Sequence, residues 1–166
     1  MDQDGFVPLD WQEVPSSEME RRCFEIYIEA SKRRTTRHFS NREVSKNIIE
    51  KAILTAGTAP NGAHLQPWTW IAISNQELKQ KIRDAAEVEE RKTYQDRMSE
   101  AWQEVLTPLG TDAVKAHITD APWVVILFRQ TKRLRNNGEW GPTYYSTESC
   151  GIAAVCSFQP FIELAL

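Results

Sequence analysis

Five consecutive positions combine guanidinium and hydroxyl groups: Arg33, Arg34, Thr35, Thr36 and Arg37. Guanidinium groups present paired donors that match phosphate oxygens, and hydroxyl groups add further donors. The cluster therefore predicts a clamp for a phosphate and nearby heteroatoms. The competing interpretation is the solvated basic end of a helix, where cations are favourable beside the helix dipole. The chain as a whole carries a net charge of −3, so three arginines within five residues favour the clamp.

A second candidate is the connection TAPNGAHLQP, residues 58–67, which is longer than most connections between a helix and a strand. Its small side chains would let a flat or anionic ligand approach backbone N–H groups. Asn61-Gly62 is also an ordinary turn signal that needs no ligand. Taken alone, the loop leaves both interpretations open.

Together, RRTTR and TAPNGAHLQPW, followed by a strand, resemble the flavin-binding signature of the nitroreductase superfamily, of which Gln66-Pro67-Trp68 is the most general part. Within that superfamily the chain resembles the iodotyrosine deiodinases. The segments AGTAPNGAHLQPWT, KIRDAAEVEERKTYQDRM and DAPWVVILF are similar to deiodinase segments in order and spacing. The resemblance covers about residues 21–153.

The resemblance implies a homodimer with FMN at the subunit interface. The residues that match cofactor-binding positions are Arg33, Arg34, Thr35, Thr36, Arg37, Asn61 and Gly62. Asn61 and Gly62 would lie under the isoalloxazine ring, with Asn61 standing where the family usually has serine. The backbone N–H of Ala63 would meet the halophenolate oxygen of the substrate.

The resemblance also assigns Glu90, Tyr94 and Lys115 to the segment that closes over a halogenated tyrosine. Glu90 and Tyr94 are four residues apart and share a helix face, and Lys115 is expected on the next helix. One carboxylate and one ammonium complement the two charges of a free amino acid. The competing interpretation for Glu90 and its charged neighbours is a solvated helix face. We call the segment that closes over the substrate the lid. We expect it to be mobile when no substrate is bound, because Glu87, Glu89 and Glu90 repel one another.

The implied reaction is reductive deiodination of mono- or di-iodotyrosine. FMN would carry the chemistry, so no residue is assigned a catalytic role. The reductant would be NADPH, acting directly or through a reductase. One alternative is a broad FMN nitroreductase acting on nitroaromatics or quinones, which the Glu90, Tyr94 and Lys115 set argues against. Another is an inactive flavin-binding or dimerisation module.

The predicted fold class is α/β (α+β), a nitroreductase-like mixed, mainly antiparallel sheet flanked by helices and incomplete at its C-terminus. We expect an N-terminal arm over residues 1–16, the flavin domain over 17–153 and a non-family tail over 154–166. The tail reads VCSFQPFIELAL, where the family continues a helix and adds a strand. Because Pro160 should break such a helix, we expect a truncated or variant form without the family's later flavin N5 contact and dimer arm.

Local signals predict the elements that position these residues. We expect a helix over 17–31 and a second helix opened by a Ser40/Glu43 capping box and closed by a left-handed Gly57. Strands are expected at 68–74 and at 123–130, the latter buried on both faces. A helix begins after Asn75 and breaks within 87–93, a short helix covers 112–118, residues 131–142 form a loop, and a last helix begins near Tyr144.

Composition excludes several classes of protein. The acidic chain is not expected to bind nucleic acid. Its three cysteines contain no C-x-x-C pair, and its three histidines show no metal-ligand spacing, so we expect neither a disulfide framework nor a metal site. The opening residues lack an apolar signal-peptide region. We therefore expect a cytoplasmic, soluble protein, or a membrane-anchored one if the true N-terminus is longer.

Overall fold

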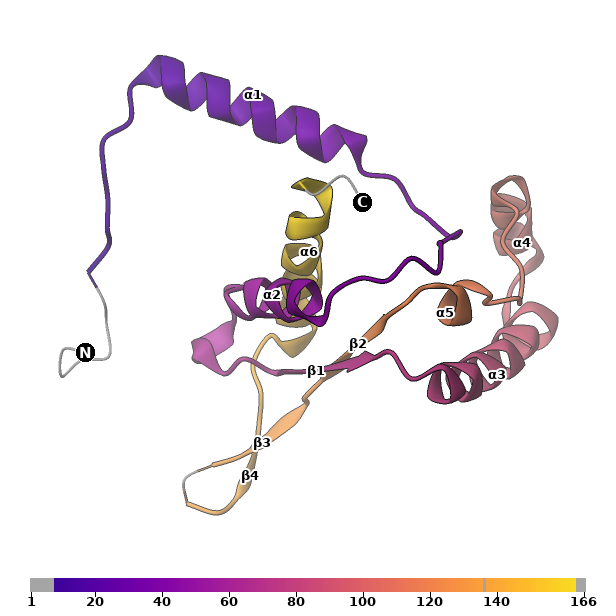
Figure 1. The fold of residues 1–166 in the computed structure, drawn as a ribbon. Coiled ribbons are helices and arrows are strands. Elements are labelled where there is room, and N and C mark those ends of the chain that lie inside the picture. Colours follow the sequence, from indigo (N-terminus) through magenta and orange to yellow (C-terminus); the bar gives the residue numbers. More distant parts are fainter. Residues whose placement is uncertain (1–7, 136, 164–166) are drawn as a thin grey trace. The chain divides into compact units, whose positions relative to one another are not determined.

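The computed structural model describes residues 8–135 and 137–163, and their side chains up to residue 158 (Figure 1). Contacts divide the chain into two compact units. Among the described residues, the first comprises residues 8–34 with 162–163, and the second lies within Thr35–Phe161. The predicted arm over 1–16 lies partly outside the described residues; residues 8–15 have no regular secondary structure.

The first unit contains α1, Ser16–Lys32, which confirms the helix predicted over 17–31. Glu18 in its first turn lies 2.7 Å from both Arg21 and Arg22. These charge-assisted hydrogen bonds, that of Arg21 first, lower the pKa of Glu18 to about 2. No residue of α1 is buried, so its apolar side chains remain exposed.

Helix α2, Lys46–Gly57, begins later than predicted, and the capping box is wrong. Ser45 is the N-cap and accepts a hydrogen bond from the Asn47 N–H, whereas Ser40 accepts only from the Arg42 N–H. The indole N–H of Trp123 donates to the Val44 carbonyl at 2.8 Å, so a tertiary contact holds this residue outside the helix. The predicted left-handed Gly57 is also wrong. Gly57 has no positive φ, and Thr58, the residue that caps the helix, has a right-handed conformation.

Strand β1, Trp68–Ile73, pairs antiparallel with β2, Val124–Arg129. Both strands confirm the predictions in position. The expectation that β2 is buried on both faces is wrong, since Val125 is 40% and Phe128 is 50% exposed. These two residues lie on opposite faces of the strand, and β1 is its partner in a two-stranded sheet.

Residues 131–142 form a second antiparallel pair rather than a loop, which corrects the prediction. Strand β3, Lys132–Leu134, pairs with β4, Trp140–Pro142. The strands are only three residues long, and the turn signals between them favour a loop in a prediction from the sequence. Gly138 adopts a positive φ of 82° in the connection, which fits the turn signal there.

Helix α3, Gln76–Lys92, is capped by the Asn75 side chain, as predicted. It then passes into a π-type turn, η2 (Thr93–Arg97), and α4, Glu100–Leu106. The α-helix therefore ends at residue 92, inside the range 87–93 where the break is predicted. A 3-10 turn, η3 (Thr107–Leu109), comes next.

The short helix predicted over 112–118 is wrong. Helix α5 covers His117–Asp120 instead. The Asp112 carboxylate accepts the Val114 N–H at 2.8 Å, and this local turn competes with helix formation.

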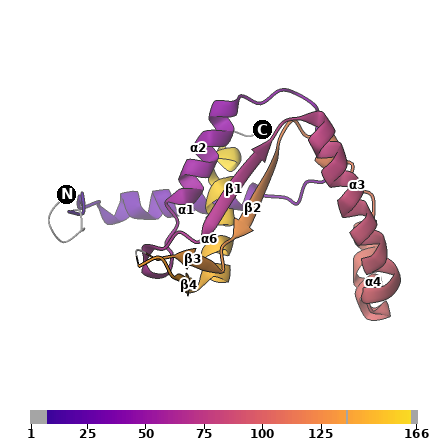
Figure 2. The ribbon, with the colours of Figure 1, turned by 90° about the horizontal axis from the view of Figure 1, so that it is seen from below.

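Helix α6, Ser146–Glu163, starts near Tyr144 as expected but continues through Pro160, so the predicted helix break is wrong. Proline removes one helical hydrogen bond, and only three helical residues follow it. The proposed domain boundary at 153/154 falls inside this helix. Figure 2 shows α2 and α6 beside the β1–β2 pair, with α3 leaving the far end of β1. The core combines these elements: Ile49, Ala52, Ala56, Ala59, Ile73, Cys150 and Ala153 are buried. Within the described residues, no helix is both long and apolar enough to cross a bilayer.

Candidate functional site

The small-residue loop adopts a left-handed backbone at several positions that are not glycine. The 3-10 turn η1 covers Gly62–His64, and φ is 52° at Ala63, 54° at His64 and 46° at Gln66. Such conformations cost on the order of 1–3 kcal/mol each and are concentrated at functional sites. The surrounding contacts must therefore hold the loop in place.

Asn61 and Gln66 supply those contacts from within the loop. The Gln66 N–H donates to Asn61 Oδ1 at 2.8 Å, and Asn61 Nδ2 donates to the Ala59 carbonyl at 3.0 Å. Gln66 Nε2 reaches the Gly57 carbonyl at 3.2 Å. Both ends of the Asn61 amide thus stabilise the loop itself.

Gly62 is small for a reason inside the chain. A Cβ atom at this position would lie 2.7 Å from the Tyr144 carbonyl oxygen and 3.1 Å from Cδ2 of Tyr145. Close packing against the start of α6 therefore requires glycine whether or not a flavin is bound. The Ala63 N–H, by contrast, has no acceptor among the described residues and is available to a ligand.

The end of the loop is fixed to α6 by a buried thiol. Cys150 Sγ donates to the Pro67 carbonyl at 3.3 Å, and Pro67 is fully buried. Burial raises the pKa of Cys150, which keeps the thiol protonated and able to donate.

The arginine cluster spans the junction of the two units. Arg33 and Arg34 close the first unit, and Thr35, Thr36 and Arg37 open the second. All five side chains are exposed. Arg34 Nη1 donates to the Ser31 carbonyl at 2.7 Å, so the helix-end interpretation also applies to it. In the described part of the chain, none of the three guanidinium groups forms an ion pair, which leaves them available to an anion.

The structure pairs two of the three predicted substrate residues, Glu90 and Lys115. Lys115 Nζ lies 3.2 Å from Glu90 Oε2, and the side chains are 20% and 38% exposed. The Tyr94 hydroxyl lies 3.1 Å from Thr111 Oγ1 on the same connecting segment. Tyr94 belongs to η2, and Lys115 precedes α5 rather than lying on a helix, which corrects its predicted setting.

The expected repulsion among the lid carboxylates is wrong, because each has a cationic partner. Glu87 lies 2.7 Å from Arg83, and Glu89 lies 2.7 Å from Lys92. The hydrogen bonds from Arg83 and from the Lys115 backbone lower the pKa of Glu87, and that from Lys92 lowers the pKa of Glu89. These ion pairs compensate the carboxylates without a substrate, and the mobility expected of the empty segment stays a prediction.

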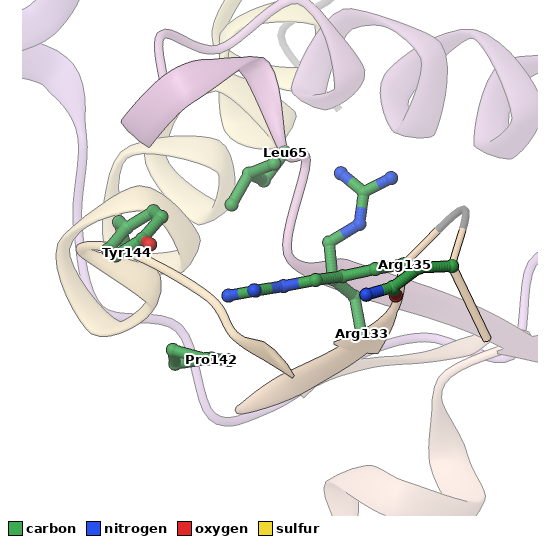
Figure 3. Close-up of a pocket in the computed structure, with 6 residues that line it drawn as sticks. Leu65, Arg133, Arg135, Pro142 and Tyr144 are labelled. Carbon is green, nitrogen blue, oxygen red and sulfur yellow. The ribbon is translucent and has the colours of Figure 1, made fainter. Parts of the chain in front are cut away.

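The sequence interpretation missed a cationic pocket of about 520 Å³ beside the loop (Figure 3). The lining residues are Leu65, Arg133, Arg135, Asn137, Pro142 and Tyr144. The arginines come from the β3–β4 hairpin, and Arg135 passes so close to Gly141 that a Cβ there would collide with it. The sequence carries no clear strand signal here, because Leu134 is the one apolar residue in KRLR.

Comparison with known proteins identifies the family. Residues 30–155 match the nitroreductase family. Iodotyrosine deiodinase from Haliscomenobacter hydrossis is 42% identical over 154 residues, which cover 93% of this chain and 68% of that protein. Iodotyrosine deiodinase 1 from Homo sapiens is 37% identical, over 89% of this chain and 51% of that protein. The chain thus spans about two thirds of the first relative and about half of the second.

Solved structures agree on the fold. An iodotyrosine deiodinase bound to FMN and 3-iodo-L-tyrosine superposes with a TM-score of 0.72 at 24% identity, covering 84% of this chain and 70% of that one. A nitroreductase with bound FMN from Desulfitobacterium hafniense superposes with a TM-score of 0.57 at 18% identity. The match covers 84% of this chain and 65% of that one. The chain belongs to the nitroreductase family, and the predicted α+β fold class is confirmed. Among its curated relatives are iodotyrosine deiodinases from bacteria and animals.

Proposed function

We propose that this protein is an FMN-dependent oxidoreductase that reductively deiodinates mono- and di-iodotyrosine. The observation that carries the proposal is the Glu90–Lys115 pair beside Tyr94. One carboxylate and one ammonium, held together on a partly exposed segment, match the ammonium and carboxylate of a free amino acid. The iodotyrosine deiodinase relatives support the same substrate class.

Binding requires this ion pair to open. The substrate ammonium takes the Glu90 carboxylate, and the substrate carboxylate takes the Lys115 ammonium, so that two intermolecular pairs replace one intramolecular pair. Tyr94, hydrogen-bonded to Thr111 and four residues after Glu90, would contribute an aromatic ring and a hydroxyl to the substrate. Exchange of one pair for two keeps every charge compensated, which favours a zwitterion over a neutral phenol.

FMN binding by this chain is part of the proposal, and it is supported by the guanidinium groups of the arginine cluster, which form no ion pair among the described residues. Residues Arg33, Arg34, Thr35, Thr36 and Arg37 would hold its phosphate, ribityl chain and ring edge. Asn61 and Gly62 would form the floor under the ring. When bound, FMN in its reduced form supplies the two electrons that break the carbon–iodine bond, with a proton replacing iodide on the ring. The chain's own contribution is orientation: the Ala63 N–H, which lacks an acceptor among the described residues, would hold the phenolate oxygen.

The proposal includes a homodimer. Three apolar residues on α6, Ile152, Val155 and Phe158, follow one another at intervals of three and are 43%, 69% and 58% exposed. A contiguous apolar surface of this kind favours burial against another protein surface, here a second copy. The electrons would come from NADPH, directly or through a reductase.

A broad FMN nitroreductase is the second candidate, supported by the family match. Such an enzyme has no need of paired opposite charges for an amino acid, so the Glu90–Lys115 geometry favours deiodination. A chain that binds flavin without turnover is the third candidate.

The test is turnover with a defined reductant. The purified chain, supplied with FMN and dithionite, should convert 3-iodo-L-tyrosine to tyrosine and iodide in equal amounts, measured by chromatography. Deiodination should exceed the rate for free FMN under the same conditions. Reduction of a nitroaromatic without deiodination would favour the general nitroreductase, and a colourless folded protein that binds no FMN would contradict both enzymatic functions.

A further inference from the structure

We propose that Glu87 is a positioning residue for substrate recognition, which places the backbone of Lys115 so that its ammonium lies opposite Glu90. The inference rests on the proposed function and concerns a residue that the deiodinase resemblance does not assign. Glu87 would not touch the substrate. It would act through Lys115, whose ammonium would touch the substrate.

The Glu87 carboxylate joins α3 to the segment before α5. Its Oε1 accepts the Lys115 backbone N–H at 3.0 Å and also Arg83 Nε at 2.7 Å. Its Oε2 lies 3.7 Å from Arg91 Nη1. The side chain is 16% exposed, far less than the 56% of Glu89 two residues later. Glu87 therefore differs from the solvated charges around it.

Arg83 fixes the Glu87 carboxylate from the other side. Its Nη1 donates to Thr119 Oγ1 at 2.8 Å, while its Nε donates to Glu87. Thr119 is buried on α5. The carboxylate is consequently held between a guanidinium anchored on α5 and the Lys115 N–H, and it has little freedom to move.

These contacts form part of one polar stripe along α3 and η2. Its members recur at helical spacing and face the segment 111–121: Gln76, Lys79, Arg83, Glu87, Glu90 and Tyr94. The first three members donate hydrogen bonds to Thr119 or Ala121. Glu90 instead contacts Lys115, and Tyr94 contacts Thr111. Glu87 stands between the anchored part and the proposed substrate residues.

The consequence is a fixed spacing between the two recognition charges. Glu90 lies on the same helix as Glu87, and Lys115 is tied to Glu87 through its backbone N–H. Lys115 Nζ also donates to the Asp112 carbonyl at 2.9 Å, which keeps the ammonium close to its own backbone. Loss of the Glu87 contact should free residues 112–116 without removing either recognition charge.

The first arm of the test needs no ligand. Amide hydrogen exchange is measured for a peptide covering residues 111–118 in wild type, Glu87→Ala, Glu87→Gln and the control Glu89→Gln. Glu87→Ala should increase exchange in this peptide, Glu87→Gln should increase it less because an amide oxygen can still accept the Lys115 N–H, and Glu89→Gln should leave it unchanged. Unchanged exchange in Glu87→Ala would overturn the proposal.

The second arm compares two probes that share a halogenated ring. The FMN-loaded protein is titrated with 3-iodo-L-tyrosine and with 2-iodophenol, which lacks the amino acid group. Glu87→Ala should weaken iodotyrosine binding by about tenfold or more. Binding of 2-iodophenol and of FMN should change less than about twofold, with Glu87→Gln intermediate for iodotyrosine.

The outcomes separate the two proposals. If Glu87→Ala weakens both probes and FMN equally, its role is general stability and the positioning role is wrong. If wild type binds 3-iodo-L-tyrosine and 2-iodophenol with equal affinity, the proposed function is wrong. The positioning role for substrate is then wrong as well, even if amide exchange rises in Glu87→Ala as expected. If only iodotyrosine binding falls while exchange rises, both proposals are supported.

Discussion

The ammonium of Lys79 lies 2.6 Å from the carbonyl oxygen of Ala121, just after the C-terminus of α5. A second carbonyl, that of Thr119, lies 3.4 Å away, and Lys79 is only 3% exposed. A cation beside the last carbonyls of a helix satisfies groups that have no helical partner. This contact fixes the first turn of α3 to the chain that leads into β2.

Replacement of this lysine should destabilise the fold. Lys79→Met keeps an aliphatic side chain but leaves two carbonyls without their donor, so the free energy of unfolding should fall by about 1–3 kcal/mol. The exposed Lys81→Met on the same helix should change it by less than about 0.5 kcal/mol. Chemical denaturation measures both. Equal effects of the two substitutions would contradict the assignment of Lys79 as an anchor.

Two glycines should respond in opposite directions to alanine. Gly62→Ala places a Cβ 2.7 Å from the Tyr144 carbonyl and should cost about 1–3 kcal/mol of stability. Gly57→Ala meets nothing within 4 Å at the end of α2 and should stabilise by about 0.4–1 kcal/mol. Thermal unfolding of both variants checks the pair. A neutral Gly62→Ala would mean that the loop and the start of α6 do not pack this closely.

Local sequence signals predict elements well where no distant contact competes. Helix α1 and strand β1 lie where propensity and pattern place them. The start of α2 does not, because the Trp123 indole holds the Val44 carbonyl from a distant part of the chain. Helix α5 is displaced because Asp112 folds back on the Val114 N–H. Side-chain hydrogen bonds to the backbone decide such boundaries, and residue spacing does not reveal them.

The site follows the same rule. The sequence predicts Glu90, Tyr94 and Lys115 as a set. The structure pairs Lys115 with Glu90, whereas the Tyr94 hydroxyl contacts Thr111. The sequence places Glu87 among solvated charges, since its helix neighbours alone do not show that it reaches the Lys115 N–H. The resemblance assigns Gly62 to a flavin, although its packing against Tyr144 suffices to require glycine.

Acid should weaken the Glu87 contacts in a defined direction. The folded pKa of Glu87 is lowered from its ordinary value of 4.5, chiefly by the hydrogen bond from Arg83 and next by that from the Lys115 N–H. The contribution of Glu87 to stability is therefore present above pH 4.5 and is lost as the pH falls through the lowered pKa of the folded state. The difference in melting temperature between wild type and Glu87→Gln should be constant near neutral pH and shrink in acid. A difference that grows in acid would contradict this sign.

Flavin affinity should depend on the arginine cluster. Arg37→Ala should weaken FMN binding by ~1.5–3 kcal/mol, the typical contribution of a charge-assisted hydrogen bond. Arg42, exposed a few residues later and outside the cluster, supplies the control Arg42→Ala, which should have little effect. Quenching of FMN fluorescence measures both affinities. Equal affinity of wild type and Arg37→Ala would rule out the phosphate clamp.

The central claim is that Glu90 and Lys115 recognise the two charges of a halogenated amino acid. The most direct measurement is the ratio of affinities for 3-iodo-L-tyrosine and 2-iodophenol, determined with the FMN-loaded protein in wild type, Glu90→Gln and Lys115→Met. Each charge-assisted contact contributes ~1.5–3 kcal/mol, and two form while the Lys115–Glu90 pair opens, so wild type should prefer iodotyrosine by about one to two decades. Each substitution should reduce that preference at least about tenfold and leave 2-iodophenol binding nearly unchanged. A wild-type protein that binds both compounds equally, or a preference that survives both substitutions, would contradict the account.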